Sequence, residues 1–291
     1  MRVLLLLLTL SLPLAAHAQT RTVQFPSAPP QANVTLTGPL TKPAGAGPFP
    51  SAILLHGGGG LDFMPSIGDY QRELTALGFV TLTFDSFKPR GVGPIDRTPL
   101  PQDKMRDVYS GRILDAYGAA IYLSTLPEVD KDRIVVMGFS DGGRVALHVA
   151  AGVSDTGTPS FDPARFVKAA VGYYPVCFGI NGPRSPPQGG RYSPEAASPA
   201  VGVTRPFLIH LAGRDDWPGS EPEVCSALWE RLKGPVEKYL YPEATHTFDD
   251  PRLAGGRKGP LGVVGYHKAS ADLAWTRTVE FLRRSLDLPA K

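Results

Sequence analysis

The sequence is poor in cysteine and has no Cys/His cluster. Among its 291 residues only Cys177 and Cys225 are cysteines, and neither belongs to a Cys-x-x-Cys or Cys/His motif. Structural zinc sites need such ligand pairs at close spacing, so the chain is expected to bind no metal.

Concentrated charge of either sign is also missing. The chain has 30 Lys and Arg against 27 Asp and Glu, which gives a net charge of +3, and it has no run of basic residues. Nucleic-acid and anionic-membrane partners usually require a basic patch, so neither is expected. The hydrophobic content of 42% and charged content of 20% are typical of a globular enzyme.

The long apolar run of the chain lies at its N-terminus. Residues 1–18 combine Arg2, a leucine-rich core and an Ala16-x-Ala18 site. This pattern is typical of a secretory signal that is cleaved after Ala18, and its core is too short for a comfortable transmembrane helix. We expect a periplasmic or secreted mature chain, residues 19–291, with no membrane contact after cleavage. An uncleaved membrane anchor is the alternative.

Short apolar runs alternate with stretches of helical periodicity along the mature chain. Strands are expected at 22–25, 32–37, 51–56, 79–84, 133–139, 166–174, 206–211 and 236–241, and helices at 69–77, 103–126, 221–232 and 269–286 and after residue 140. This alternation predicts a single α/β domain with a mostly parallel sheet and helices on both faces. Residues 177–204 are rich in Gly, Pro and Ser and lack periodicity, which makes them a candidate lid excursion.

The two cysteines are expected near one rim of this sheet. Cys177 follows the strand that ends at Tyr174, and Cys225 lies in the helix after the next strand. In an oxidising compartment this placement predicts a disulfide between them. Two buried, unpaired cysteines are the alternative.

A Gly-x-Ser-x-Gly motif at 138–142 joins a buried strand to a helix. This is the context of a nucleophile elbow, in which Ser140 stands on a tight strand-to-helix turn. A serine hydroxyl needs a base and an orienting acid, and these follow the serine on later loops in hydrolases of this order. His246 follows the last strand, and counting three residues from Gly213 selects Asp216 as the acid.

A glycine run follows another strand of the predicted sheet. His56 is followed by four glycines, 57–60, which predicts a loop whose backbone amides face the site. The amides of Gly58 and of Asp141, the residue after the serine, are the expected oxyanion donors. A phosphate-binding loop is disfavoured because no Gly-Lys-Ser/Thr follows.

Together, these motifs resemble the dienelactone hydrolase family. They are His-Gly-Gly-Gly-Gly-Leu at 56–61, Asp-Ser-Phe at 85–87 with Arg-Gly at 90–91, Gly-Phe-Ser-Asp-Gly-Gly at 138–143, Asp-Asp-Trp at 215–217, and the 241–249 loop. The resemblance implies an α/β-hydrolase fold and cofactor-free cleavage of lactones and small carboxylic esters. Founding members carry cysteine where this chain has Ser140. The resemblance leaves two site assignments open.

The first open assignment is the acid, because alignment of Asp-Asp-Trp selects Asp215 rather than Asp216. The second is Arg90, because arginines of the family hold a substrate carboxylate. Arg90 is therefore a candidate substrate-binding residue, and pairing within its own loop is the alternative.

The sequence therefore predicts a serine hydrolase of small-molecule esters or lactones that works through an acyl-enzyme. Ser140, Asp216 and His246 would form the triad, without a cofactor. A peptidase-like or polyester-cleaving hydrolase and a catalytically silent binding protein are the alternatives. The complete set of three side chains argues against the silent binder.

Overall fold

The computed structural model describes residues 17–95, 100–152, 163–178, 202–259 and 261–289. The first 16 residues of the expected signal and most of the candidate lid, 179–201, lie outside the described residues. Within the described chain, no helix is both long and apolar enough to cross a membrane.

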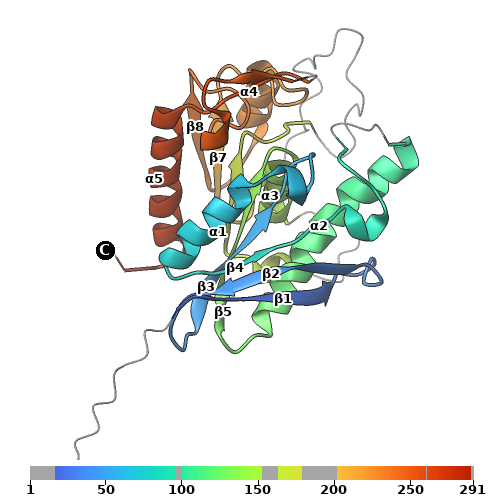
Figure 1. The fold of residues 1–291 in the computed structure, drawn as a ribbon, viewed down its shortest axis with the longest axis vertical. Helices are drawn as coiled ribbons and strands as arrows, with labels where there is room; N and C mark the ends of the chain where they lie inside the picture. Colours follow the sequence, from blue (N-terminus) through green and yellow to red (C-terminus); the bar gives the residue numbers. More distant parts are fainter. Residues whose placement is uncertain (1–16, 96–99, 153–162, 179–201, 260, 290–291) are drawn as a thin grey trace, which may run out of the picture.

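An eight-stranded sheet forms the centre of the fold (Figure 1), in the order β1-β2-β4-β3-β5-β6-β7-β8. Within this sheet β1 pairs antiparallel with β2 and β2 with β4, and the other neighbouring strands are parallel. The strands are β1 (Gln19–Pro26), β2 (Thr35–Lys42), β3 (Phe49–Leu55), β4 (Val80–Thr83), β5 (Val129–Phe139), β6 (Ala169–Tyr173), β7 (Phe207–Ala212) and β8 (Val236–Tyr241). The predicted mostly parallel α/β sheet is confirmed.

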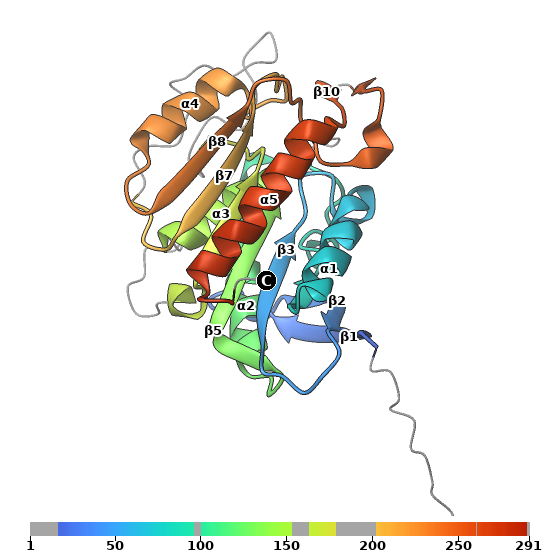
Figure 2. The same cartoon turned by 90° about the vertical axis from the view of Figure 1, so that its left-hand side faces the viewer.

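Helices cover both faces of this sheet (Figure 2). They are α1 (Ser66–Ala76), α2 (Gln102–Ser124), α3 (Asp141–Ala151), α4 (Pro222–Arg231) and α5 (Lys268–Ser285). Successive strand side chains point to opposite faces, so β3 divides its residues between two apolar cores. Ile53 and Leu55 belong to the core shared with α2, α3 and α4, whereas Ala52 and Leu54 belong to the core shared with α1 and α5.

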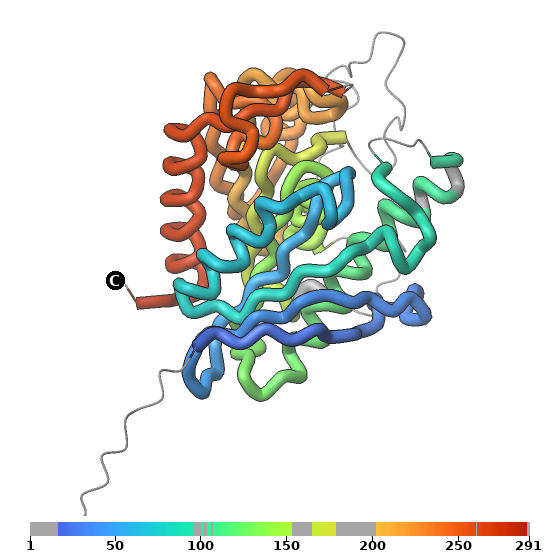
Figure 3. Tube along the Cα trace, in the orientation of Figure 1, coloured from blue at the N-terminus to red at the C-terminus, as the bar shows by residue number. Residues whose placement is uncertain are grey.

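The parallel strands end at one common edge of the sheet. Helix α5 begins at this edge and descends to the opposite one (Figure 3), as expected for a helix that follows a parallel strand. Open α/β sheets bind ligands outside the carboxyl ends of their strands. The residues after β5, β7 and β8 are therefore brought together at this edge.

The predicted disulfide is present. Cys177 and Cys225 are bonded, with Cα atoms 5.1 Å apart. Cys177 also donates its backbone N–H to the carbonyl oxygen of Gly219 at 2.7 Å. The bond fixes the segment after β6 to helix α4, beside the edge where the strands end.

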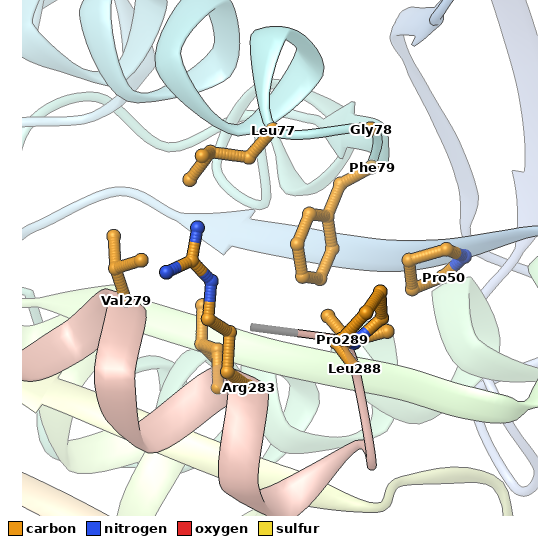
Figure 4. A pocket seen from close by; sticks show the side chains of 9 residues that line it. Pro50, Leu77, Gly78, Phe79, Val279, Arg283, Leu288 and Pro289 are labelled. Carbon is orange, nitrogen blue, oxygen red and sulfur yellow. The ribbon is translucent and has the colours of Figure 1, made fainter. Parts of the chain in front are cut away.

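A small apolar pocket of about 150 Å³ lies at the opposite edge (Figure 4). Pro50 lies near the start of β3 and Phe79 immediately precedes β4, and both line the pocket together with residues of α5. This location is at the amino ends of the strands, so the pocket is separate from the site described next.

Candidate active site

Ser140 occupies the strained turn between β5 and α3. Its φ of 54° and ψ of −120° are unusual for a residue with a side chain. The turn is held on both sides, because the Ser140 N–H donates to Tyr173 O at 2.9 Å and Ser140 O accepts from the N–H of Gly143 at 2.9 Å. Such strain persists only where neighbouring structure enforces it, and it marks Ser140 as a candidate functional residue.

The two glycines of the motif allow the turn to pack this tightly. A Cβ atom on Gly138 would lie 2.0 Å from the carbonyl oxygen of Gly142, and one on Gly142 would lie 2.3 Å from the carbonyl oxygen of Leu55. Both contacts are with backbone, which cannot move aside cheaply. The motif therefore specifies the backbone geometry that presents the serine.

A chain of hydrogen-bonding side chains runs from Ser140 through His246 to Asp215. The Ser140 Oγ lies 2.9 Å from His246 Nε2, and His246 Nδ1 lies 2.8 Å from Asp215 Oδ2. Asp215 and His246 are buried, with side-chain exposures of 0% and 4%. Burial raises the pKa of the Asp215 carboxyl, and this effect is opposed by its contact with His246. An imidazole held between a hydroxyl and a carboxylate can move a proton from the hydroxyl.

The expectation that Asp216 orients the histidine is wrong, because Asp215 makes that contact. Asp216 Oδ1 instead accepts the backbone N–H of Val263 at 2.6 Å. Asp215 uses its second oxygen, Oδ1, to accept the Trp217 N–H at 3.0 Å. The loop after β7 reaches the histidine one residue earlier than the count from Gly213 assumes, as the Asp-Asp-Trp alignment suggests.

Backbone hydrogen bonds align the loop of the acid with the loop of the histidine. The N–H of Gly213 donates to Tyr241 O, and that of Arg214 donates to Ala244 O, each at 2.8 Å. These bonds continue the pairing of β7 with β8 beyond the strand ends. They fix which residue of the acidic pair lies opposite His246.

Two aromatic rings pack against the His246 imidazole. The Trp217 ring is stacked on it, with centroids 4.8 Å apart and an interplanar angle of 8°. Tyr174 makes a T-shaped contact at 4.9 Å and donates its hydroxyl to Asp249 Oδ1 at 2.8 Å. Tyr174 has a φ of 34°, so its backbone is strained like that of Ser140. Sequence patterns assign neither ring a role, although Trp217 belongs to the Asp-Asp-Trp motif.

The glycine loop approaches the serine closely. A Cβ atom on Gly57 would lie 3.2 Å from Ser140 Cβ. His56 orders the loop, because its Nδ1 lies 2.7 Å from Gly57 O and its Nε2 accepts the Ser86 N–H at 3.1 Å. Burial and the nearby Arg112 lower the pKa of His56 to about 3, so the ring stays neutral with Nδ1 as the donor. Holding Gly57 O fixes the plane of the peptide that carries the Gly58 N–H.

Asp141 begins α3, where a backbone N–H has no partner within the helix. Its side chain is buried between two guanidinium groups, those of Arg112 and Arg144. Burial acts to raise the pKa of Asp141, but Arg144 and Arg112 outweigh it and lower that pKa. Arg112 also donates to the carbonyl oxygen of His56, so it links the elbow with the glycine loop.

Arg90 does not take the expected substrate-binding position. Its guanidinium donates to both carboxylate oxygens of Asp115, at 2.8 and 2.9 Å, to Gln31 Oε1 at 2.7 Å and to Ser86 O at 2.8 Å. The side chains of Arg90 and Asp115 are 5% and 0% exposed. The prediction that Arg90 binds a substrate carboxylate is therefore corrected. The guanidinium N–H groups that would bind it are occupied by the buried carboxylate of Asp115.

The described residues contain no group of three or more His, Cys, Asp or Glu side chains that could hold a metal ion. His210 is buried within β7, between the Tyr241 hydroxyl and the Thr278 hydroxyl, at 2.8 and 2.9 Å. Burial lowers the pKa of His210 to about 3. It is a neutral core histidine and lies outside the Ser140 site.

The sheet order, the elbow and the loops after β7 and β8 define an α/β-hydrolase fold. The profile of the dienelactone hydrolase family matches residues 36–286, so the chain belongs to that family. It is accordingly an enzyme that hydrolyses carboxylic esters or lactones.

Three known proteins illustrate this similarity. A Bradyrhizobium protein named "Probable 2-oxo-3-(5-oxofuran-2-ylidene)propanoate lactonase" is 25% identical over 251 residues. The match covers 84% of this chain and 87% of that protein. The structure of a dienelactone hydrolase from Anabaena variabilis has a TM-score of 0.54 at 22% identity, with 92% of this chain and 100% of that chain covered. An acetyl xylan esterase from Paenibacillus has a TM-score of 0.58 at 19% identity, with coverages of 91% and 88%. The two structures share the fold.

Proposed function

We propose that the protein is a serine hydrolase of small carboxylic esters or lactones that forms an acyl-enzyme on Ser140. The observation that carries this proposal is the continuous contact from Ser140 Oγ to His246 to Asp215, at 2.9 and 2.8 Å. Its acid is Asp215 and not Asp216.

In the first half-reaction, Ser140 Oγ attacks the carbonyl carbon while His246 Nε2 accepts the hydroxyl proton. The tetrahedral intermediate then collapses, and His246 returns the proton to the departing alkoxide oxygen. A lactone ring opens in this step and its alcohol end stays attached to the acyl group. Water attacks the acyl-enzyme in the same way and frees Ser140.

The oxyanion of each intermediate needs donors, and the proposal assigns the N–H groups of Gly58 and Asp141. Gly57 packs against Ser140, and the peptide plane of Gly58 is held by His56. Asp141 is the first residue of α3, so the positive end of the α3 dipole lies at the same place. Removing one such donor typically costs on the order of 3 kcal/mol of transition-state stabilisation.

An aspartate beside the nucleophile would repel a developing oxyanion if its charge were not balanced. Arg112 and Arg144 both contact the Asp141 carboxylate, so the buried cluster carries one positive charge in excess. This arrangement supports an anionic intermediate at the elbow, because the two guanidinium groups offset the negative charge of the nearby Asp141 carboxylate.

Lactones and small esters are the proposed substrate class. The relative named as a lactonase matches most of this chain, which supports a lactone. An ester of an acetylated sugar is a second candidate, favoured by the acetyl xylan esterase of the same fold. The disulfide and the N-terminal leader pattern support an exported protein whose signal is cleaved after Ala18.

A substrate panel on the purified mature chain tests the proposal. The panel holds aryl esters, lactones, acetylated xylan, a polyester and a peptide anilide. The proposal expects turnover of esters or lactones that falls by at least about 10³-fold in Ser140→Ala and in His246→Ala. Ser285→Ala, on the far end of α5, is the matched control and should retain wild-type rates.

Two outcomes would overturn the proposal. Ester turnover near the wild-type rate in Ser140→Ala would exclude the nucleophile. Cleavage of the peptide or polyester alone, or binding without turnover, would instead support the peptidase-like or polyester-cleaving hydrolase, or the silent binding protein.

A further inference from the structure

Trp217 covers the flat face of the His246 imidazole. The two rings are nearly parallel, at 8°, with centroids 4.8 Å apart. We propose that Trp217 is a positioning residue whose indole face stabilises the positively charged imidazolium that His246 becomes during the reaction. The catalytic part of this proposal rests on the proposed function, in which His246 is the base.

Protonation of the imidazole strengthens this stack. Nearly parallel rings with centroids 4.8 Å apart form an offset stack, a contact that neutral aromatic rings also favour. A cation over an aromatic face is attracted to it in addition, and tryptophan gives the strongest such contact. The parallel stack of Trp217 on His246 therefore gains most when the imidazole carries the proton taken from Ser140.

Trp217 is held at this position by the acid itself. Its backbone N–H donates to Asp215 Oδ1 at 3.0 Å, while Asp215 Oδ2 lies 2.8 Å from His246 Nδ1. The Trp217 carbonyl oxygen accepts the Ser220 N–H at 2.9 Å. One residue thus orients the carboxylate through its backbone and covers the imidazole with its ring. Both contacts favour the imidazolium, so they act in the same direction.

Several other ionisable groups lie around His246. Asp215 and Asp216 lie on the loop after β7, and Asp249 lies on the histidine's own loop, where Tyr70 and Tyr174 donate to it. Asp250, on that same loop, pairs with Arg252. Ser140 faces Nε2 from the elbow. All of these groups remain in a variant of Trp217, so their effects cancel when two such variants are compared.

Comparison of Trp217→Phe with Trp217→Leu isolates the contribution of the aromatic face. Both side chains keep apolar cover over the imidazole, but only Phe offers a π face. NMR titration of the His246 ring, assigned with His246→Gln, measures the pH at which half of the rings are protonated. We expect this midpoint to lie at least about 0.4 pH unit lower in the Leu variant than in the Phe variant. This difference is about 2.5-fold in the protonation equilibrium.

The controls separate stacking from a general loss of structure. Trp229→Leu removes a tryptophan of α4 that packs against Lys238, and it should leave the His246 midpoint unchanged. Trp217→Met is a second variant without a ring, for use if the Leu variant does not fold. A midpoint in the Leu or Met variant equal to or higher than that in the Phe variant overturns the proposal.

Kinetics distinguish this proposal from the proposed function. In the active enzyme, the acid limb of the kcat/KM profile should move to lower pH in Trp217→Leu by the same amount as the NMR midpoint. A merely structural role would lower kcat without moving the limb, and that result contradicts the proposal. If the wild-type chain hydrolyses no ester or lactone, the proposed function fails while the NMR comparison still tests the stacking.

Discussion

His246 and Asp215 meet through a hydrogen bond of 2.8 Å, while the neighbouring Asp216 turns away to the backbone of Val263. Two adjacent carboxylates thus have different roles, which a kinetic comparison can separate. Asp215→Asn should lower kcat by about 10³- to 10⁴-fold, because the amide no longer stabilises the imidazolium or its required tautomer. Asp216→Asn is the matched control, and steady-state kinetics should show less than about a threefold loss. Equal losses in the two variants would contradict the assignment.

Arg90 should matter for stability rather than for substrate choice. Arg90→Met leaves the buried Asp115 carboxylate without its partner, and the free energy of unfolding should fall by about 3–5 kcal/mol. Urea unfolding measures this loss, and Arg90→Met/Asp115→Leu should recover much of it because both charges are then removed. The KM ratio between a carboxylate-bearing ester and its neutral analogue should be unchanged in Arg90→Met. A selective rise in KM for the anionic ester would restore Arg90 as a substrate contact.

The disulfide between Cys177 and Cys225 closes a loop across a sequence separation of 48 residues. The double variant Cys177→Ala/Cys225→Ala should lose roughly 2–4 kcal/mol of the free energy of unfolding, because its unfolded chain is less restricted. Denaturant unfolding of the wild type with and without a reductant should give the same difference. An unchanged unfolding midpoint after full reduction would show that the bond does not stabilise the fold.

Buried neutral histidines should make the fold less stable in mild acid. The pKa of His210 is lowered by burial to about 3, below its ordinary value of 6.5. Above pH 6.5 the ring is neutral in both states. As the pH falls from 6.5 toward 3, the unfolded chain binds a proton that the folded chain cannot, so stability is lost.

The expected loss between pH 7 and pH 5 is about 2 kcal/mol from His210. Urea unfolding at the two pH values measures it, and His210→Gln should remove this part of the pH dependence. The buried His56, whose pKa is also about 3, should add its own loss in both proteins. An equal pH dependence in the wild type and in His210→Gln would contradict the origin proposed here.

The sheet and the elbow could be predicted from the sequence because local patterns determine them. The run 133–139 is apolar and β-branched, and the glycines that follow allow only a very tight turn, so the strand and Ser140 were both identifiable. The choice between Asp215 and Asp216 depends on hydrogen bonds between two loops, and no periodicity encodes such a one-residue offset.

Distant partners were similarly hidden from the sequence. Arg90 ends a short 3-10 helix, Lys88–Arg90, and its carboxylate partner, Asp115, is 25 residues away on α2. Arg112 stands in the same helix, and only the folded chain brings it to Asp141 and the glycine loop. The stacking of Trp217 on His246 likewise joins residues from two loops. Sequence patterns indicated the kind of site, and tertiary packing selected the residues that complete it.

The most direct test of the central claim is covalent labelling of Ser140. The mature protein is treated with a fluorophosphonate, and intact mass followed by peptide mapping locates the adduct. We expect one adduct per chain on the peptide that contains Ser140, none in Ser140→Ala, and much slower labelling in His246→Ala. An adduct on another residue, or full ester turnover by a wild-type protein that the reagent does not label, would contradict the account.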